Sequence, residues 1–201
     1  MALTIIFLPR ETPCILSLVN SIPSLKRLQK DIKKLLDIGI IEPSKSEWSS
    51  PLHLVPKGSN DWRLVGDYRA LNKRTERDTY PLPFLQNFSA ELGGKKIFSK
   101  IDLKDAFYQI KINPTDVPKT TITTPFGAYS YRRMNFGLSG ASQTFQRFIN
   151  SVLWDLYVES SDGSLVRPVT VFAYVDDLLV ASNNEDEHME DMDVLLKRLS
   201  D

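Results

Sequence analysis

One run of residues organises this 201-residue chain, namely Phe172-Ala173-Tyr174-Val175-Asp176-Asp177-Leu178-Leu179-Val180. The apolar residues on either side predict two buried strands, with Asp176 and Asp177 at the turn between them. Since Asp favours turns, an ordinary hairpin explains the pair on local grounds. The functional alternative is that the turn presents carboxylate oxygens, which are the ligands that a hard divalent cation prefers.

A second segment offers another carboxylate. Residues 97–101 are typical of a strand, and Asp102 lies at its end, where it could also cap the turn that follows. Successive strand side chains point to opposite faces, so only one of Asp176 and Asp177 would face a site squarely unless the turn rotates the other. If Asp102 lies beside the hairpin, the three acidic residues could hold two Mg²⁺ ions and clamp the oxygens of an in-line phosphoryl transfer.

Two cations flank a predicted hairpin nearer the N-terminus. Residues 50–57 and 62–65 are predicted to be strands joined by Gly58-Ser59-Asn60-Asp61. Lys57 and Arg63 lie on either side of its tip, where a bidentate Arg and a point-charge Lys could hold a triphosphate. A solvated hairpin with exposed charges explains the same residues equally well.

The remaining pattern predicts a mixture of helices and strands. Ser24 is the expected N-cap of an amphipathic helix that carries Lys and Arg on its polar face. The apolar face of this helix is formed by Leu25, Leu28, Ile32, Leu35 and Leu36. Further helices are predicted over about 84–92, 142–156 and 184–199, and strands over 109–113 and 119–124. Residues 157–168 are expected to form a polar surface loop, and Asp105 is expected to be a cap or turn residue.

Composition places the chain among ordinary globular proteins, with 42% hydrophobic and 25% charged residues. Its 25 basic and 25 acidic residues cancel, so no overall field draws a polyanion. The distribution is nevertheless uneven, because residues 53–77 carry an excess of bases and residues 185–201 an excess of acids. The single Cys14 excludes an internal disulfide framework and fits a reducing compartment.

The first 20 residues contain two short apolar runs that are broken by Pro9-Arg10-Glu11-Thr12-Pro13. Neither run is long enough to span a bilayer, and no basic leader precedes them. We therefore expect no membrane partner. An intracellular location, in the cytoplasm or a virus-like particle, is expected rather than secretion.

Three blocks of the sequence together resemble a reverse transcriptase. They are the 172–180 run, Asp102-Leu103-Lys104-Asp105-Ala106-Phe107-Tyr108-Gln109-Ile110, and Trp62-Arg63-Leu64-Val65-Gly66-Asp67-Tyr68-Arg69-Ala70-Leu71-Asn72. The resemblance is to the polymerase of gypsy-type LTR retrotransposons, which is related to the retroviral enzymes, and it runs from about Leu25 to the C-terminus. A Tyr-X-Asp-Asp motif alone is weak, whereas these blocks in this order and spacing are specific.

The resemblance implies an α+β fold built on a polymerase palm, which is a ferredoxin-like antiparallel sheet with helices on one face. A fingers insertion would cover about 41–80 and the palm about 81–201. Residues 24–201 would then form the fingers–palm domain, and residues 1–23 stay unassigned. The thumb, connection and RNase H regions of a full family enzyme are expected to be absent.

The resemblance also implies an activity, which is RNA-directed DNA polymerisation on a primed RNA or DNA template with dNTPs. Asp102, Asp176 and Asp177 would hold two Mg²⁺ ions, for which Mn²⁺ could substitute. The thumb and RNase H of a longer polyprotein are possible partners. His188 matches a family position with an expected packing role, whereas His53 is expected to be structural because no second His lies near it.

Four further residues would bind the incoming nucleotide. Lys57 and Arg63 would hold its phosphates, Phe107 would exclude a 2′-hydroxyl from the sugar site, and Phe136 would line the base pocket where retroviral enzymes carry Gln. Without the resemblance, a core position is the better interpretation of Phe107.

The sequence departs from the family pattern at three positions of one loop. The family usually carries Pro, Asn and Pro where this chain has Asn135, Gly140 and Ser142. These changes are expected to loosen the loop, because Gly140 gains backbone freedom and Asn135 loses a fixed φ. An inactive retroelement remnant that at most binds nucleic acid is therefore the main alternative function. An unrelated two-metal nuclease would share the carboxylate chemistry but leaves Lys57, Arg63 and Phe107 unexplained.

Overall fold

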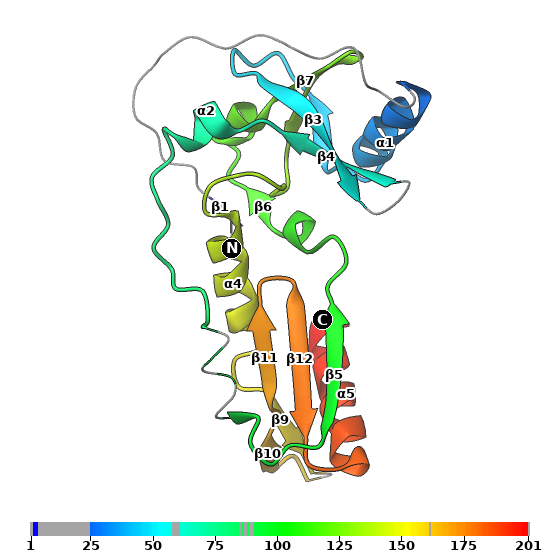
Figure 1. The fold of residues 1–201 in the computed structure, drawn as a ribbon, viewed down its shortest axis with the longest axis vertical. Helices are drawn as coiled ribbons and strands as arrows, with labels where there is room; N and C mark the ends of the chain where they lie inside the picture. Colours follow the sequence, from blue (N-terminus) through cyan, green and yellow to red (C-terminus); the bar gives the residue numbers. More distant parts are fainter. Residues whose placement is uncertain are drawn as a thin grey trace. The chain divides into compact units, whose positions relative to one another are not determined.

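The computed structural model of the protein describes residues 2–3, 25–57, 61–84, 86, 88, 91–160 and 162–200. The chain forms two compact units. The first comprises Met1–Asp78 and Phe107–Ala141, and the second comprises Thr79–Ala106 and Ser142–Asp201. Each unit combines strands with helices, which confirms the α+β class (Figure 1).

The first unit is built around a five-stranded sheet of order β2-β8-β7-β3-β4. Neighbouring strands are antiparallel except for β3 and β7, which are parallel. A separate short pair joins β1 and β6 in parallel. The elements in or reaching into this unit are β1 (Ala2–Leu3), α1 (Leu25–Asp37), β2 (Ile41–Pro43), β3 (Ser50–Lys57), β4 (Asp61–Gly66), α2 (Arg69–Asn72), η1 (Ala106–Gln109), β6 (Lys111–Ile112), η2 (Val117–Thr120), β7 (Ile122–Thr124) and β8 (Gly127–Tyr131).

The predicted hairpin at 50–57 and 62–65 is confirmed as β3 and β4. The predicted strands at 109–113 and 119–124 were too long, because only β6 and β7 form there and η2 lies between them. Pro118 lies in the first turn of η2, where its missing N–H costs nothing. Thr120 donates its hydroxyl to the carbonyl of Val117 over 2.7 Å, which closes this short helix instead of extending a strand.

Helix α1 confirms the predicted amphipathic pattern, since Leu28, Ile32 and Leu35 are buried. Leu25, which was assigned to the apolar face, is instead 52% exposed. The predicted N-cap Ser24 lies outside the described residues. The helix ends at Asp37, and Gly39 terminates it with a φ of +70° and an N–H bond to the carbonyl of Leu36 (3.0 Å).

The expected loosening at Asn135 is not what the structure shows. Asn135 is only 2% exposed, and its side-chain amide donates to the hydroxyl of Tyr68 over 3.0 Å. Tyr68 in turn donates to the carbonyl of Thr120 over 2.8 Å, and burial raises the pKa of its phenol. One buried hydrogen bond therefore holds the side chain of Asn135, although its Oδ1 is buried without a partner among the described residues. Further along the same loop, Gly140 has a φ of +76°, a conformation that costs glycine least.

The second unit contains a three-stranded antiparallel sheet of order β11-β12-β5, shown side by side in Figure 1. Its elements are β5 (Ile97–Asp102), α4 (Ala141–Val152), β9 (Tyr157–Glu159), β10 (Leu165–Pro168), β11 (Val171–Tyr174), β12 (Asp177–Ser182) and α5 (Glu185–Ser200). The helix predicted over 184–199 is confirmed as α5, whereas the one predicted over 142–156 ends earlier, at Val152. The segment 84–92 is described only in part, and its described residues Gln86, Phe88 and Glu91 are helical.

The two faces of this sheet differ in what covers them. Leu178 and Val180 are fully buried on the face against which α5 packs. In Figure 1 this red helix runs along the back of β12 and β5. Directly paired residues share a face, so Asp177 and Asp102 project together from the other side of the sheet. The register thus places Asp102, Asp177 and Lys100 on the face opposite Leu178 and Val180.

Residues 157–168 were expected to be a polar loop, and this was wrong. Within them, β9 and β10 form an antiparallel hairpin, and of the described residues only 160 and 162–164 lie between the two strands. The backbone N–H of Ser160 donates to the carbonyl of Ser164 over 2.9 Å, which closes the tip. The polar residues of the tip dominated the sequence pattern, although Tyr157-Val158-Glu159 and Leu165-Val166-Arg167 flank it as short strands.

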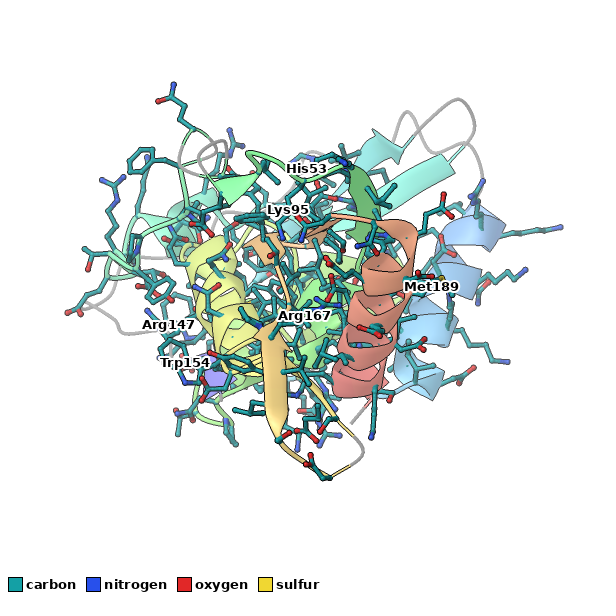
Figure 2. All side chains as sticks on the ribbon, turned by 90° about the horizontal axis from the view of Figure 1, so that it is seen from below. His53, Lys95, Arg147, Trp154, Arg167 and Met189 are labelled. Carbon is teal, nitrogen blue, oxygen red and sulfur yellow. The ribbon has the colours of Figure 1, made fainter. Side chains whose placement is uncertain are left out.

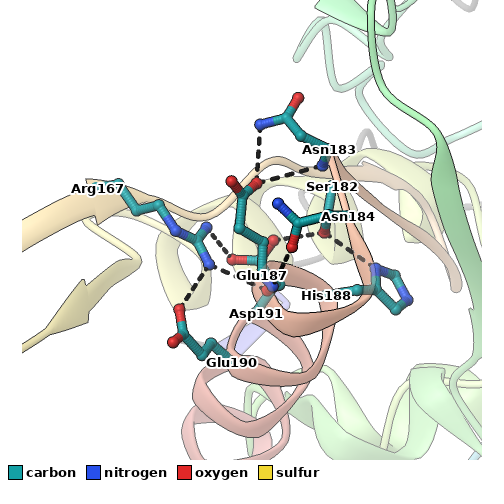
Figure 3. A network of polar contacts seen from close by, with 8 residues as sticks. All are labelled: Arg167, Ser182, Asn183, Asn184, Glu187, His188, Glu190 and Asp191. Carbon is teal, nitrogen blue, oxygen red and sulfur yellow. Dashed lines mark hydrogen bonds and ion pairs between the residues drawn. The ribbon is translucent and has the colours of Figure 1, made fainter.

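A network of polar contacts ties this hairpin to α5 (Figure 3). The guanidinium of Arg167 on β10 donates to Asp191 over 2.5 Å and to Glu190 over 3.0 Å. Asp191 also accepts the hydroxyl of Ser182 over 2.5 Å, and Ser182 contacts Nδ1 of His188 at 2.9 Å. The buried polar groups therefore satisfy one another along a chain that starts at the hairpin.

The network fixes the tautomer of His188. Since Ser182 gives its only hydroxyl proton to the carboxylate of Asp191, it must accept a hydrogen bond from Nδ1–H of His188. In the neutral imidazole, Nε2 then accepts the hydroxyl of Ser99, which lies 2.8 Å away. His188 therefore joins strands β5 and β12 by hydrogen bonds, which is more than the packing role expected for it.

We expect Asp191→Asn to lower the free energy of unfolding by about 3 kcal/mol, because it removes the buried carboxylate that accepts both Arg167 and Ser182. Asp191 is 1% exposed, whereas Glu190, which contacts the same guanidinium, is 58% exposed. Glu190→Gln is the matched control and should cost less than about 1 kcal/mol. Urea unfolding measures both variants, and equal losses would contradict the buried-network account.

Candidate active site

The carboxylates of the predicted site come from two adjacent strands of the second unit. Asp102 ends β5 and is the direct cross-strand partner of Asp177, which begins β12. Asp176 lies in the two-residue turn before Asp177, so the turn consists of Val175 and Asp176 rather than of the acid pair. The carbonyl of Asp176 accepts the N–H of Leu103 over 2.9 Å, which ties the turn to the end of β5. The structure thus brings the ends of these segments together although they are far apart in sequence.

A lysine lies among these acids. Nζ of Lys100 is 3.0 Å from Oδ1 of Asp177, and both side chains are partly exposed. This hydrogen bond is the main cause that raises the pKa of Lys100, and the charges of Asp177, Asp102 and Asp176 raise it further. All three carboxylates therefore contribute to one region of negative potential, where a cation is favoured.

Across the described residues, no group of three or more His, Cys, Asp or Glu side chains is placed to hold a metal ion. The donor set is nevertheless of the chemical kind that Mg²⁺ selects, namely carboxylate oxygens at a partly exposed edge. Protein sites for Mg²⁺ commonly supply one or two carboxylates and leave the other positions to water and substrate phosphates.

The turn that carries Asp176 is strained. Val175 has a φ of +54°, and for a β-branched residue this conformation costs about 1–3 kcal/mol. The side chain of Gln146 on α4 holds it in place, since Oε1 accepts the N–H of Val175 over 2.8 Å and Nε2 donates to the carbonyl of Ala173 over 3.0 Å. This one side-chain amide thus provides a hydrogen-bond partner for a backbone N–H and for a backbone carbonyl at the end of β11.

Gln146 is itself fixed by further contacts. It is fully buried, and Nε2 also donates to Oδ1 of Asn150 over 2.9 Å. Asn150 donates to the hydroxyl of Tyr80 over 2.8 Å, and the guanidinium of Arg147 lies 4.7 Å from the centre of the Tyr80 ring. Gln146 was not predicted from the sequence, where it stands out only as a polar residue beside the buried Phe145 on an amphipathic helix.

The first unit gathers three of the four nucleotide-site candidates. The guanidinium of Arg63 lies 4.1 Å from the centre of the Phe136 ring, a cation–π contact. The rings of Phe107 and Phe136 are 5.0 Å apart, and Tyr108, which sequence analysis missed, is 6.5 Å from Phe136. The side chain of the fourth candidate, Lys57, lies outside the described residues.

Asn72 clamps the loop that carries Phe136. Its side-chain amide donates to the carbonyl of Gly137 over 2.7 Å, and its Oδ1 accepts the N–H of Ser139 over 2.8 Å. Nearby, Arg69 makes a bidentate pair with Asp67, which holds the pKa of that carboxyl well below its usual range. The block from 62 to 72 therefore supports the loop at 136–139 through direct contacts.

Comparisons with known proteins agree with this architecture. Residues 55–201 match the family model described as "Reverse transcriptase (RNA-dependent DNA polymerase)". The chain belongs to the reverse transcriptase family, as the resemblance of its sequence blocks indicated. None of the described helices has the length and apolar character needed to cross a membrane.

The relatives are retrotransposon polyproteins. The chain is 36% identical over 178 residues to the "Retrovirus-related Pol polyprotein from transposon opus" of Drosophila melanogaster, which covers 86% of this chain and 17% of that polyprotein. It is 37% identical over 180 residues to the corresponding polyprotein from transposon gypsy of the same organism, with 87% and 16% covered. The chain therefore spans less than a fifth of the length of these relatives.

Solved structures share the fold. The protease–reverse transcriptase of prototype foamy virus superimposes with a TM-score of 0.78 at 25% identity, over 94% of this chain and 24% of that one. A foamy viral protease–reverse transcriptase in complex with an RNA/DNA hybrid gives a TM-score of 0.75 at 22% identity, over 96% and 24%. Both comparisons confirm the reverse transcriptase fold.

Proposed function

We propose that this chain carries the fingers–palm part of an RNA-directed DNA polymerase, with fingers at about 41–80 and palm at about 81–201. The reaction is template-directed transfer of a nucleotide onto the 3′-hydroxyl of a primer. The primer oxygen bonds to the α-phosphorus of a dNTP, the bond to the bridging oxygen breaks, pyrophosphate leaves, and the hydroxyl proton is released. The observation that carries the proposal is the pairing of Asp102 with Asp177 beside the turn that holds Asp176.

Asp102, Asp176 and Asp177 are proposed to hold two Mg²⁺ ions, with Mn²⁺ as a substitute. The partly exposed carboxylates and the ammonium of Lys100 on Asp177 support this, because they show an edge of the sheet where positive charge is favoured. When bound, the ions supply the charge that stabilises the attacking and leaving oxygens. The protein residues fix the position of the carboxylates through the β5–β12 register and the Gln146-held turn.

Arg63 and Lys57 are proposed to bind the phosphates of the dNTP, Phe107 to contact its sugar and Phe136 its base. The cluster of Arg63, Phe107 and Phe136 supports these roles, since a planar cation and aromatic faces are the groups that bind phosphate and stack on a base. Template and primer are the proposed macromolecular partners, together with the thumb and RNase H of a longer polyprotein.

Primer extension with dNTPs, with and without Mg²⁺, tests the proposal, and Asp176→Asn serves as the inactive control. Extension that requires Mg²⁺ and is lost in Asp176→Asn is the expected result. Binding of primer–template without extension would favour the inactive remnant. Cleavage of the nucleic acid without synthesis would instead favour a two-metal nuclease.

We expect Phe107→Val to admit ribonucleotides, because the smaller side chain opens volume for a 2′-hydroxyl. The ratio of kcat/KM for rNTP over dNTP should rise on the order of 10²-fold, the discrimination that a shaped apolar pocket can supply. Phe107 is 8% exposed and packs on Phe136. Tyr108→Phe, in the same aromatic cluster, is the control and should leave the ratio unchanged. An unchanged ratio in Phe107→Val would assign Phe107 to the core alone.

A further inference from the structure

Helix α1 presents a row of lysines that neither the fold nor the candidate active site uses. We define the basic stripe as Lys26, Lys30, Lys33 and Lys34, all of which are exposed. At 3.6 residues per turn these four positions fall within an arc of about 100° on one side of the helix. In Figure 2 the long side chains of α1, the blue helix, project away from the ribbon.

The stripe carries a net positive charge, since Asp37 is the one acid of α1 that falls within its arc. Lys30 lies three or four residues from each of the other three lysines, and like charges at these spacings destabilise a helix by a few tenths of a kcal/mol per pair. None of the four makes an ion pair with a residue in the described part of the chain. Helix α1 holds five basic and two acidic residues, although the whole chain has a net charge of zero.

The opposite side of α1 argues against insertion of this helix into a lipid surface. A basic amphipathic helix binds membranes through its apolar face. Here Leu28 and Ile32 are each 3% exposed, so that face is already used in packing within the first unit. The exposed side carries the lysines, and Leu25 is the one apolar residue of α1 that is more than half exposed, which is too little for a hydrophobic anchor.

The spacing of the stripe suits a repeating polyanion. Along a helix that rises about 1.5 Å per residue, Lys26, Lys30 and Lys34 recur every ~6 Å, and Lys33 lies beside them. A nucleic-acid backbone presents phosphates in a regular row at a comparable scale, and lysine binds them as point charges without reading sequence. Binding such a backbone would also relieve the repulsion among the lysines.

We propose that the basic stripe of α1 is a nucleic-acid contact surface that binds backbone phosphates of the template. The stripe would bind the template in addition to the carboxylates and to the cluster of Arg63, Phe107 and Phe136. The proposal rests on the proposed function, since a polymerase must hold its template. Its contribution is electrostatic and independent of base sequence, so it should fall steeply as salt rises.

The test is a comparison of two quadruple variants of the full chain. One is Lys26→Gln/Lys30→Gln/Lys33→Gln/Lys34→Gln, in which Gln keeps the helix propensity of Lys. The control is Lys73→Gln/Lys96→Gln/Lys111→Gln/Lys197→Gln, which removes the same charge from exposed positions elsewhere. Fluorescence anisotropy gives the Kd for a labelled RNA/DNA primer–template from about 50 to 200 mM salt, the range over which binding to phosphates weakens strongly.

We expect the magnitude of the slope of log K against log salt to fall by about 3 in the stripe variant, at about 0.7–0.9 for each of the phosphates that the four lysines no longer neutralise, and by less than about 1 in the control. Equal slopes in the two variants would overturn the proposal. So would a stripe variant that loses binding to polyglutamate but keeps its affinity for the primer–template, because the surface would then take an acidic protein. Primer extension by the stripe variant is also measured at saturating primer–template. This measurement tests the proposed polymerase chemistry independently of binding by the stripe, so failure of one proposal can be told from failure of the other.

Discussion

Asp102→Asn is expected to lower the rate of primer extension by about 10³-fold, because metal coordination contributes several kcal/mol to charge stabilisation in phosphoryl transfer. Asn keeps the volume of Asp and its strand position opposite Asp177, so β5 should still pair with β12. The substitution removes one of the negative charges that favour Lys100 and a divalent cation. It also replaces a carboxylate oxygen with a neutral amide oxygen, which is a weaker ligand for a hard cation.

The chain supplies a matched control three residues further on. Asp105 is exposed and has a φ of +54°, a conformation that Asn tolerates as well as Asp. Asp105→Asn removes the same charge near the same strand and should leave extension within a few-fold of the unaltered protein. Binding of Mn²⁺, followed by calorimetry, should weaken in Asp102→Asn and not in Asp105→Asn. Full activity of Asp102→Asn would remove the carboxylate group from the proposed mechanism.

The parts of the fold that were predictable from sequence depend on local patterns. The run from 172 to 180 places apolar residues on both sides of an acid pair, and it forms the β11–β12 hairpin, although the turn is Val175-Asp176. Residues 97–101 carry the β-branched and apolar residues of a strand, and Asp102 does end it. The helix of residues 25–37 follows a 3.6-residue period with a Gly stop. Each signal lies within a few residues, where propensity and burial agree.

The parts that were not predictable depend on partners that are distant in sequence. The hairpin β9–β10 was taken for a loop because the contact that stabilises it, from Arg167 to Asp191, joins residues 24 positions apart. The position of Asp176 in the turn depends on Gln146, which lies 29 residues before Val175. The buried role of Asn135 likewise required Tyr68, which is 67 residues away. No local pattern encodes these pairs.

The resemblance supplied what periodicity alone could not. An acid at a strand end and an acid pair at a turn leave their register open, and the structure places Asp102 directly opposite Asp177. Arg63, Phe107 and Phe136 are separated by 73 positions in sequence and still form one cluster in the first unit. Phe107 is both a core residue and part of this cluster, so the two interpretations of it are compatible.

Gln146→Met is the second substitution with a large expected effect. Met matches the volume of Gln but can neither accept the N–H of Val175 nor donate to the carbonyl of Ala173. An unsatisfied buried backbone group costs about 1–3 kcal/mol, and this is comparable with the strain of a positive φ at a β-branched residue. Val175 should therefore leave its φ of +54° and move Asp176 with it.

A displacement of catalytic groups by about 1 Å lowers rates on the order of 10²-fold, so kcat for primer extension should fall by that factor while the Kd for primer–template stays unchanged. Val175→Gly distinguishes a positioning role from a general loss of stability. Gly adopts positive φ without strain, so the double variant Gln146→Met/Val175→Gly no longer needs the amide to enforce the turn. The kcat of the double variant is expected to be at least about tenfold higher than that of Gln146→Met, which recovers part of the 10²-fold loss attributed to geometry. If the double variant unfolds earlier and stays as slow as Gln146→Met, the role of Gln146 is to stabilise α4 and not to place Asp176.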